Sequence, residues 1–267
     1  MRILGKDAVY HKAVFEVRYE HGMVYLDRCG TTANRIMATY PEWVIRDDAV
    51  NPQSAPLTNA LTGTLFNFGT QKYDFSLSQP VGKDVALTRT DLATFSSQVD
   101  GVARIVHEEL GLHHFLRLGF RIWFMFPTDS EQESNRWVRD LGVCRVTPEV
   151  SKAFGGQLES EGYVLLVNGD DRRFRIAINP VERLEVLDLG VEALTALPRR
   201  LPKKQREALL EKLKAKQRVL SNPETAVMID VDAYVEEPIE VDPADFITQS
   251  LLTIEEKLPR ALCGGRV

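Results

Sequence analysis

The sequence predicts an α+β protein in which one curved antiparallel sheet carries two long helices on one face. Several short stretches alternate between apolar and polar residues, as strands do, and two long stretches, 90–111 and 242–260, carry an apolar residue at every third or fourth position. The order strand, short helix, several antiparallel strands, long helix occurs twice. This order predicts tandem β-α-β(3-4)-α repeats, with a first half at residues 1–112 and a second half at residues 113–267.

The first half opens with a strand, because residues 13–20 alternate between apolar and charged side chains. Residues 31–41 follow a glycine, begin with threonine and end at a proline, which predicts a short helix. Residues 42–47 predict a second strand, and residues 47–61 are rich in turn-forming residues and predict a polar loop.

The rest of the first half predicts antiparallel strands and then a long helix. Residues 64–68 and 73–77 alternate on either side of a GTQK turn and predict a hairpin, and residues 84–88 predict one more strand. A Thr-Asp pair opens the helix at 90–111, and Gly111 ends it. The apolar stripe of this helix consists of Leu92, Phe95, Val99, Val102, Val106 and Leu110.

The second half repeats this order. Residues 118–126 alternate as a strand, and residues 129–142 predict a short capped helix. Residues 163–167 and 174–178 flank an Asn-Gly-Asp turn and predict a hairpin, and residues 227–231 predict a further strand.

The second long helix starts at an Asp-Pro pair, which is typical of a helix N-terminus. Its stripe consists of Ile247, Leu251, Ile254 and Leu258. An insertion at about 181–223 predicts a protruding surface helix. Within it, residues 199–218 hold nine basic residues and two acidic ones, whereas residues 219–256 hold ten acidic residues and no basic one. Two readings are open: two solvated faces that pair with each other, or a basic arm that binds a partner.

The composition excludes several classes of protein. The chain of 267 residues is 44% hydrophobic, enough for one large domain or two small ones. Its formal net charge of −5 argues against sequence-independent binding of nucleic acid. Three widely spaced cysteines predict no disulfide framework. Residues 1–17 contain neither a long apolar core nor a small-residue cleavage site, and the sequence contains no apolar run of membrane-spanning length. These features predict a cytoplasmic protein that does not enter a membrane.

The stretch HEELGLHH contains histidines and glutamates but not the spacing of a zinc site. His107 and His113 are six residues apart, with Gly111 between them, whereas a helical zinc motif places histidines four apart. We therefore expect a helix end and a turn, with His107 near the helix C-terminus, where a partial positive charge is favourable. A metal site formed by His107, Glu108 and His113 or His114 is the alternative. The sequence contains no recognisable catalytic motif and implies no cofactor.

Two strand sequences, VFEVRY at residues 14–19 and RLGFRIW at residues 117–123, carry a family resemblance. They resemble the hallmark strands of a sporadically distributed, uncharacterised family of bacterial proteins of similar length. The resemblance implies no catalytic residue, because the family has no established activity. At the level of the fold alone, the predicted arrangement also resembles the pseudo-symmetric saddle of the TATA-box-binding-protein type. If the two halves are unrelated, an α+β protein with a curved antiparallel sheet is still expected.

The two hallmark strands are the first strands of the two halves, so we expect them side by side at the centre of the sheet. Side chains alternate along a strand, so the polar residues of both strands face away from the helices. The candidate site on this face consists of Glu16, Arg18, Arg117, Arg121 and Trp123. These residues form either a ladder of cross-strand ion pairs or a groove for a partner or ligand.

The function that these observations favour is a non-enzymatic binding or scaffold protein that acts with a protein partner in a bacterial operon-encoded system. The alternative is an enzyme or sensor that binds a small anionic ligand on the open sheet face. The sequence leaves open whether the chain forms a homo-oligomer.

Overall fold

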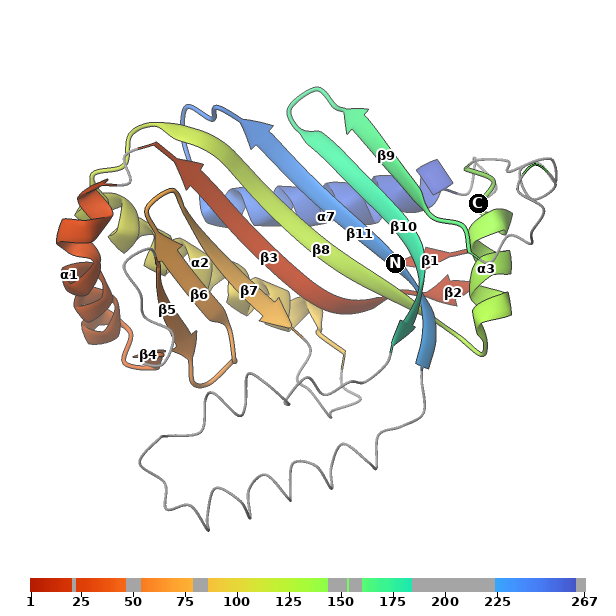
Figure 1. Ribbon diagram of the computed structural model, residues 1–267, viewed down its shortest axis with the longest axis horizontal. Coiled ribbons are helices and arrows are strands. Elements are labelled where there is room, and N and C mark those ends of the chain that lie inside the picture. Colours follow the sequence, from red (N-terminus) through yellow and green to blue (C-terminus); the bar gives the residue numbers. More distant parts are fainter. Residues whose placement is uncertain are drawn as a thin grey trace, which may run out of the picture.

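The computed structural model forms one large antiparallel sheet with helices packed on it (Figure 1). Within the residues that it describes, there are nine strands in this sheet, a separate two-stranded ribbon of β1 (Arg2–Ile3) and β2 (Lys6–Asp7), and four helices. The α+β class and the large antiparallel sheet are therefore confirmed. The described residues are 1–20, 23–46, 54–78, 86–143, 153, 160–183 and 224–262.

The strands of the large sheet follow the order β4-β5-β6-β7-β3-β8-β11-β10-β9. The two strands that carry the hallmark sequences, β3 and β8, lie side by side near the centre and run antiparallel, with Phe15 opposite Phe120. This neighbourhood is the one expected from the sequence. The strands span β3 (Val9–Tyr19), β4 (Trp43–Ile45), β5 (Ser54–Asn59), β6 (Leu65–Gly69), β7 (Lys72–Ser78), β8 (Phe115–Thr128), β9 (Tyr163–Asn168), β10 (Arg173–Arg183) and β11 (Glu224–Glu236).

The four helices that the structure describes leave one face of the sheet uncovered. Figure 1 shows α2 (Arg89–Leu110) and α7 (Pro243–Leu262) on the same face, α2 behind β6 and β7 and α7 behind β11 and β10. The shorter helices, α1 (Met23–Thr39) and α3 (Glu131–Asp140), stand at opposite ends of the sheet. We call the face opposite α2 and α7 the open face.

The core lies between the sheet and the long helices. All six residues of the predicted stripe on α2 are buried, and on α7 three of the four are buried while Leu251 is half-buried. From the sheet, alternate residues of β3 and β8 such as Phe15, Val17, Phe120 and Ile122 face this layer and are buried. The period of the apolar residues therefore located the core surface of each of these elements.

Helix α2 begins at Arg89, one residue before the predicted start. The N-cap is Thr88, whose hydroxyl accepts a hydrogen bond from the N–H of Asp91, while the Asp91 carboxylate accepts one from the N–H of Thr88. This reciprocal pair satisfies two N–H groups at the helix start. Gly111 ends the helix in the left-handed conformation, at φ 58°, as predicted.

The structure corrects two expectations in the first half. Helix α1 begins at Met23, not at Thr31, because its inner side packs on the core through Tyr25 and Ile36 along four turns. The loop expected at 47–61 contains strand β5, which pairs with β4 and β6 and buries Leu57. Tertiary pairing outweighs the turn-forming composition of this stretch.

Two further expectations lie mostly outside the described residues. Residues 79–85 lie outside the described ranges, so the structure describes only residues 86–88 of the strand expected at 84–88. There, Leu87 forms an isolated bridge with Tyr10. Strand β10 continues to Arg183, and the remainder of the predicted insertion, residues 184–223, lies outside the described ranges.

Candidate partner-binding face

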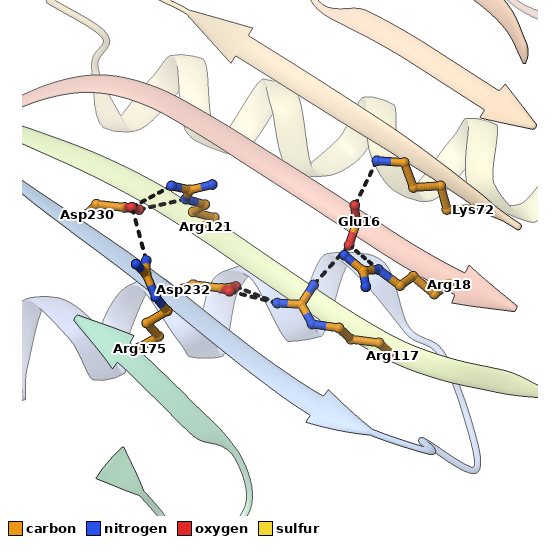
Figure 2. Close-up of polar contacts among 8 residues, drawn as sticks. All are labelled: Glu16, Arg18, Lys72, Arg117, Arg121, Arg175, Asp230 and Asp232. Carbon is orange, nitrogen blue, oxygen red and sulfur yellow. Dashed lines mark hydrogen bonds and ion pairs between the residues drawn. The ribbon is translucent and has the colours of Figure 1, made fainter. Parts of the chain in front are cut away.

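All five residues of the predicted site lie on the open face. Arg18 stands opposite Arg117, and Trp123 opposite Lys12, in the β3–β8 register, while the residues between them point into the core. The charged side chains form two sets of ion pairs (Figure 2). One joins Lys72, Glu16, Arg18, Arg117 and Asp232 across β7, β3, β8 and β11, and the other joins Arg121, Asp230 and Arg175 across β8, β11 and β10. These contacts are the cross-strand ion pairs that were one of the two interpretations of these residues. We call them the ladder.

Glu16 is the acceptor of three cations. Arg18 Nε donates to its carboxylate at 2.8 Å, Lys72 Nζ at 2.9 Å and Arg117 Nη1 at 3.1 Å. Burial of the Glu16 carboxyl raises its pKa, but the hydrogen bonds and charges of Lys72 and Arg18 outweigh burial and leave the pKa below its ordinary value. Glu16 is therefore a fixed anion that orients its cations.

Arg117 on β8 links the two neighbouring strands, β3 and β11, on the open face. Its guanidinium reaches Glu16 on β3 and donates to both carboxylate oxygens of Asp232 on β11, at 2.7 and 2.9 Å. It also lies over the ring of Tyr234, 4.9 Å from the centroid. The largest influence on Asp232 is burial, which raises its pKa although Arg117 acts in the opposite direction. With two carboxylate partners, Arg117 is a structural bridge and not an open binding group.

Arg121 forms a second, separate pair on the same strand. Its Nε donates to one oxygen of Asp230 at 2.7 Å and its Nη2 to the other at 2.5 Å. Arg175 on β10 approaches the same carboxylate at 3.6 Å. The Asp230 side chain is buried, so these cations supply the polar partners that water supplies to an exposed side chain.

Trp123 is held between cationic and aromatic neighbours. The ring of His11 stacks on it, Lys12 Nζ lies 4.8 Å from its centroid and the Arg121 guanidinium 5.3 Å. The side chain is half-buried, and its indole N–H is buried without a hydrogen-bond partner among the described residues. Trp123 is thus less open than the alternation of β8 suggests, because its neighbours cover the ring.

Sequence reasoning missed four members of the ladder: Lys72, Arg175, Asp230 and Asp232. A signal was present for the two aspartates, since the sequence MIDVDAY around them alternates as strictly as the hallmark strands do. The apolar half of this alternation predicted strand β11, and its polar half marks the open face.

The open face also carries a pocket of about 520 Å³ beside the β6–β7 turn. Arg18, Lys72 and Asp74 line it together with the turn residues Gly69 to Gln71. Two of the cations that contact Glu16 therefore also face a space that a small molecule could enter.

Within the described residues, His107, His113 and His114 belong to no group of side chains that could hold a metal ion. His107 is hydrogen-bonded through Nε2 to the hydroxyl of Tyr73, at 2.7 Å, and burial lowers its pKa to about 4. The predicted helix end and turn are present, with Gly111 as the C-cap, but burial disfavours a charge on His107 more than the helix C-terminus favours it. His113 and His114 are exposed at the start of β8, and no group of three metal-binding side chains occurs within the described ranges.

The fold and the open face together define an α+β protein with cross-strand ion pairs on the sheet face that its described helices leave uncovered. No family model matches the chain, and no curated protein or solved structure matches it either. Among the described residues, no helix has both the length and the apolar character needed to span a bilayer.

Proposed function

We propose that the protein is a non-enzymatic binding or scaffold protein that holds a protein partner on its open face. The observation that carries this proposal is a difference in exposure within the ladder. The side chains of Arg18, Lys72, Arg121 and Arg175 are 54%, 49%, 42% and 41% exposed. Those of Glu16, Asp74 and Asp230 are 15%, 18% and 4% exposed.

This difference in exposure determines which charges a partner contacts on the open face. The short acidic side chains lie low on the sheet, and the longer cationic ones extend over them, so the exposed ends of the ladder are mostly cationic. A chain with net charge −5 disfavours a long polyanion such as nucleic acid. A folded protein with a local acidic patch fits both facts, and arginine is among the residues that most often anchor such interfaces.

The test removes exposed cations and spares the buried acids. In a variant with Arg18→Gln and Arg175→Gln, Glu16 keeps Lys72 and Arg117, and Asp230 keeps Arg121. We expect the wild-type protein to capture a partner at low salt and to release it as the salt concentration increases. The variant should not capture this partner. The control is Arg104→Gln, because Arg104 is exposed on α2 and pairs with Asp100. Equal capture by all three proteins would contradict the proposal.

A second function is favoured by the pocket beside the β6–β7 turn. Arg18 and Lys72 both line it, so a small carboxylate or phosphate compound is a candidate ligand. A thermal-shift screen against such anions tests this directly, since a ligand that binds the folded state raises its melting temperature. The shift should vanish with Lys72→Gln and persist with Arg104→Gln.

We also propose that the two halves are tandem repeats, arranged as a saddle of the TATA-box-binding-protein type. The order of elements supports this: counted outward from the centre, β3, β7, β6 and β5 correspond to β8, β11, β10 and β9. The helices follow the same correspondence, α1 with α3 and α2 with α7. A crystal structure in which β3 to α2 superposes on β8 to α7 would support the repeat, and a poor superposition would remove it.

A further inference from the structure

We propose that the chain pairs with a second copy of itself along strand β9, so that two nine-stranded sheets join into one. One edge of β9 pairs with β10, and the other edge has no strand beside it in the part of the chain that the structure describes. The backbone N–H and C=O groups along such an edge are a template for another strand.

The side chains of β9 are unusual for an exposed edge. Leu166 is 74% exposed and Val164 is 56% exposed on the open face, and Val167 is exposed on the opposite face. The sequence YVLLVN contains no charge and no proline, the two features that commonly protect an edge strand from pairing. At the other end of the sheet, β4 has only three residues, and its shortness protects that edge.

A two-fold axis perpendicular to the sheet at Leu165 gives a register that suits this sequence. In an antiparallel pair of β9 strands, Leu165 then meets its own copy, Val164 meets Leu166, and Tyr163 meets Val167. Each pair consists of residues on the same face of the sheet, as strand pairing requires. Every one of these cross-strand pairs is apolar or aromatic, so the strand is complementary to itself.

We call the boundary between the two β9 strands the seam. The charged residues next to the seam are compatible with this register. On β10, Arg175 is the neighbour of Leu166, and Ala177 is the neighbour of Val164. Across the seam, the row that starts at Arg175 of one copy therefore ends at Ala177 of the other, and no two like charges face each other. Because β9 carries no charge, it has no side chain that would attract an acidic or a basic peptide. A second β9 strand, in contrast, places apolar residues opposite apolar residues on both faces of the sheet. For these reasons we choose a second copy as the occupant.

The seam would also place the two open faces in one continuous surface. A two-fold axis perpendicular to the sheet keeps α2 and α7 of both copies on the same side, so the cationic ladders lie on the other side together. A partner with two acidic patches could then bind both copies, which raises the apparent affinity without any new contact. This consequence rests on the proposed function, but the seam itself does not.

The first experiment measures the mass of the full chain by sedimentation equilibrium over a dilution series. We expect a dimer that dissociates on dilution, because a six-residue strand is a small interface. Leu166→Lys should raise the dissociation constant by at least about tenfold, since it places a charge in the apolar row. Ile239→Lys is the control, because Ile239 is exposed in the loop between β11 and α7, outside β9, and its substitution should leave the dimer unchanged.

The second experiment tests the register. With Leu165→Cys, mild oxidation should produce a disulfide-linked dimer joined at position 165, because residues on the axis approach within disulfide distance. The wild-type chain, which contains Cys29, Cys144 and Cys263, serves as the background, and mass spectrometry identifies the linked peptide. A wild-type chain that stays monomeric at every concentration would overturn the seam, as would a dimer that Leu166→Lys leaves intact. A monomer that still captures a partner through Arg18 and Arg175 would remove the seam and leave the proposed function standing.

Discussion

The guanidinium of Arg117 lies over the Cα of Gly119, so closely that a Cβ at Gly119 would come within 2.6 Å of Arg117 Nη1. A methyl group at Gly119 would occupy part of the space in which Arg117 reaches Glu16 and Asp232 together, so the guanidinium would have to move. The central glycine of the RLGFRIW strand therefore has a physical role, which is to let one arginine cross the middle of the sheet.

Gly119→Ala should displace Arg117 and weaken both of its ion pairs. We expect the free energy of unfolding to fall by about 1–2 kcal/mol, because Asp232 loses a charged hydrogen-bond partner in a half-buried position. Urea denaturation measures the loss. Gly30→Ala is the control, since Gly30 lies within α1 with nothing within 4 Å of the new methyl group, and that change should stabilise the helix. Equal stability of Gly119→Ala and the wild type would show that Arg117 moves at no cost.

Arg121→Ala should destabilise the protein more than Arg18→Ala does. Removing Arg121 leaves the buried carboxylate of Asp230 with Arg175 at 3.6 Å, and we expect a loss of about 1–3 kcal/mol. Removing Arg18 leaves Glu16 with two other cations, so the change should stay within about 0.5 kcal/mol. Thermal and urea unfolding of both variants measure the difference. If the two variants were equally stable, Asp230 would not depend on Arg121.

Phe95→Ala should cost about 3–5 kcal/mol of stability. Phe95 is fully buried on α2 at the layer between helix and sheet, so its removal leaves a cavity among well-packed neighbours. Leu252→Ala, at an exposed position of α7, is the comparison and should be nearly neutral. Chemical denaturation provides both values, and a small effect of Phe95→Ala would place that side chain outside the core.

The stability of the protein should depend on the charge state of His107. Burial lowers the pKa of His107 to about 4 in the folded state, whereas the unfolded chain binds the proton near pH 6.5. Between these values the unfolded state holds more protons, so the free energy of unfolding falls as the pH decreases from about 6.5 to about 4.

His107→Gln provides the control for this pH dependence. Glutamine can still hydrogen-bond to Tyr73 but does not titrate, so the difference between the two proteins isolates the histidine. We expect the wild type to lose stability relative to the variant as the pH falls, in urea titrations between pH 7 and pH 4.5. Parallel curves would mean that His107 is not buried as a neutral ring.

The sequence by itself determined the elements whose pattern is local. The period of three or four along α2 identified its buried stripe, and the alternation in β3 and β8 placed Glu16, Arg18 and Arg121 on one face, because side-chain direction depends only on backbone geometry. The prediction that the two hallmark strands lie side by side was made from the repeat expected in the sequence, and the pairing of β3 with β8 confirms their neighbourhood.

The tertiary structure alone decided which charges meet and which groups lose their water. Arg121 and Asp230 are 109 residues apart, and only the pairing of β8 with β11 brings them together. His107 is neutral because of what packs around it, which no local pattern in HEELGLHH records. Strand β5 forms in a stretch of turn-forming residues because β4 and β6 supply its hydrogen-bond partners. Ion pairing, desolvation and strand pairing all depend on neighbours distant in the chain, and for that reason they could not be predicted from local sequence.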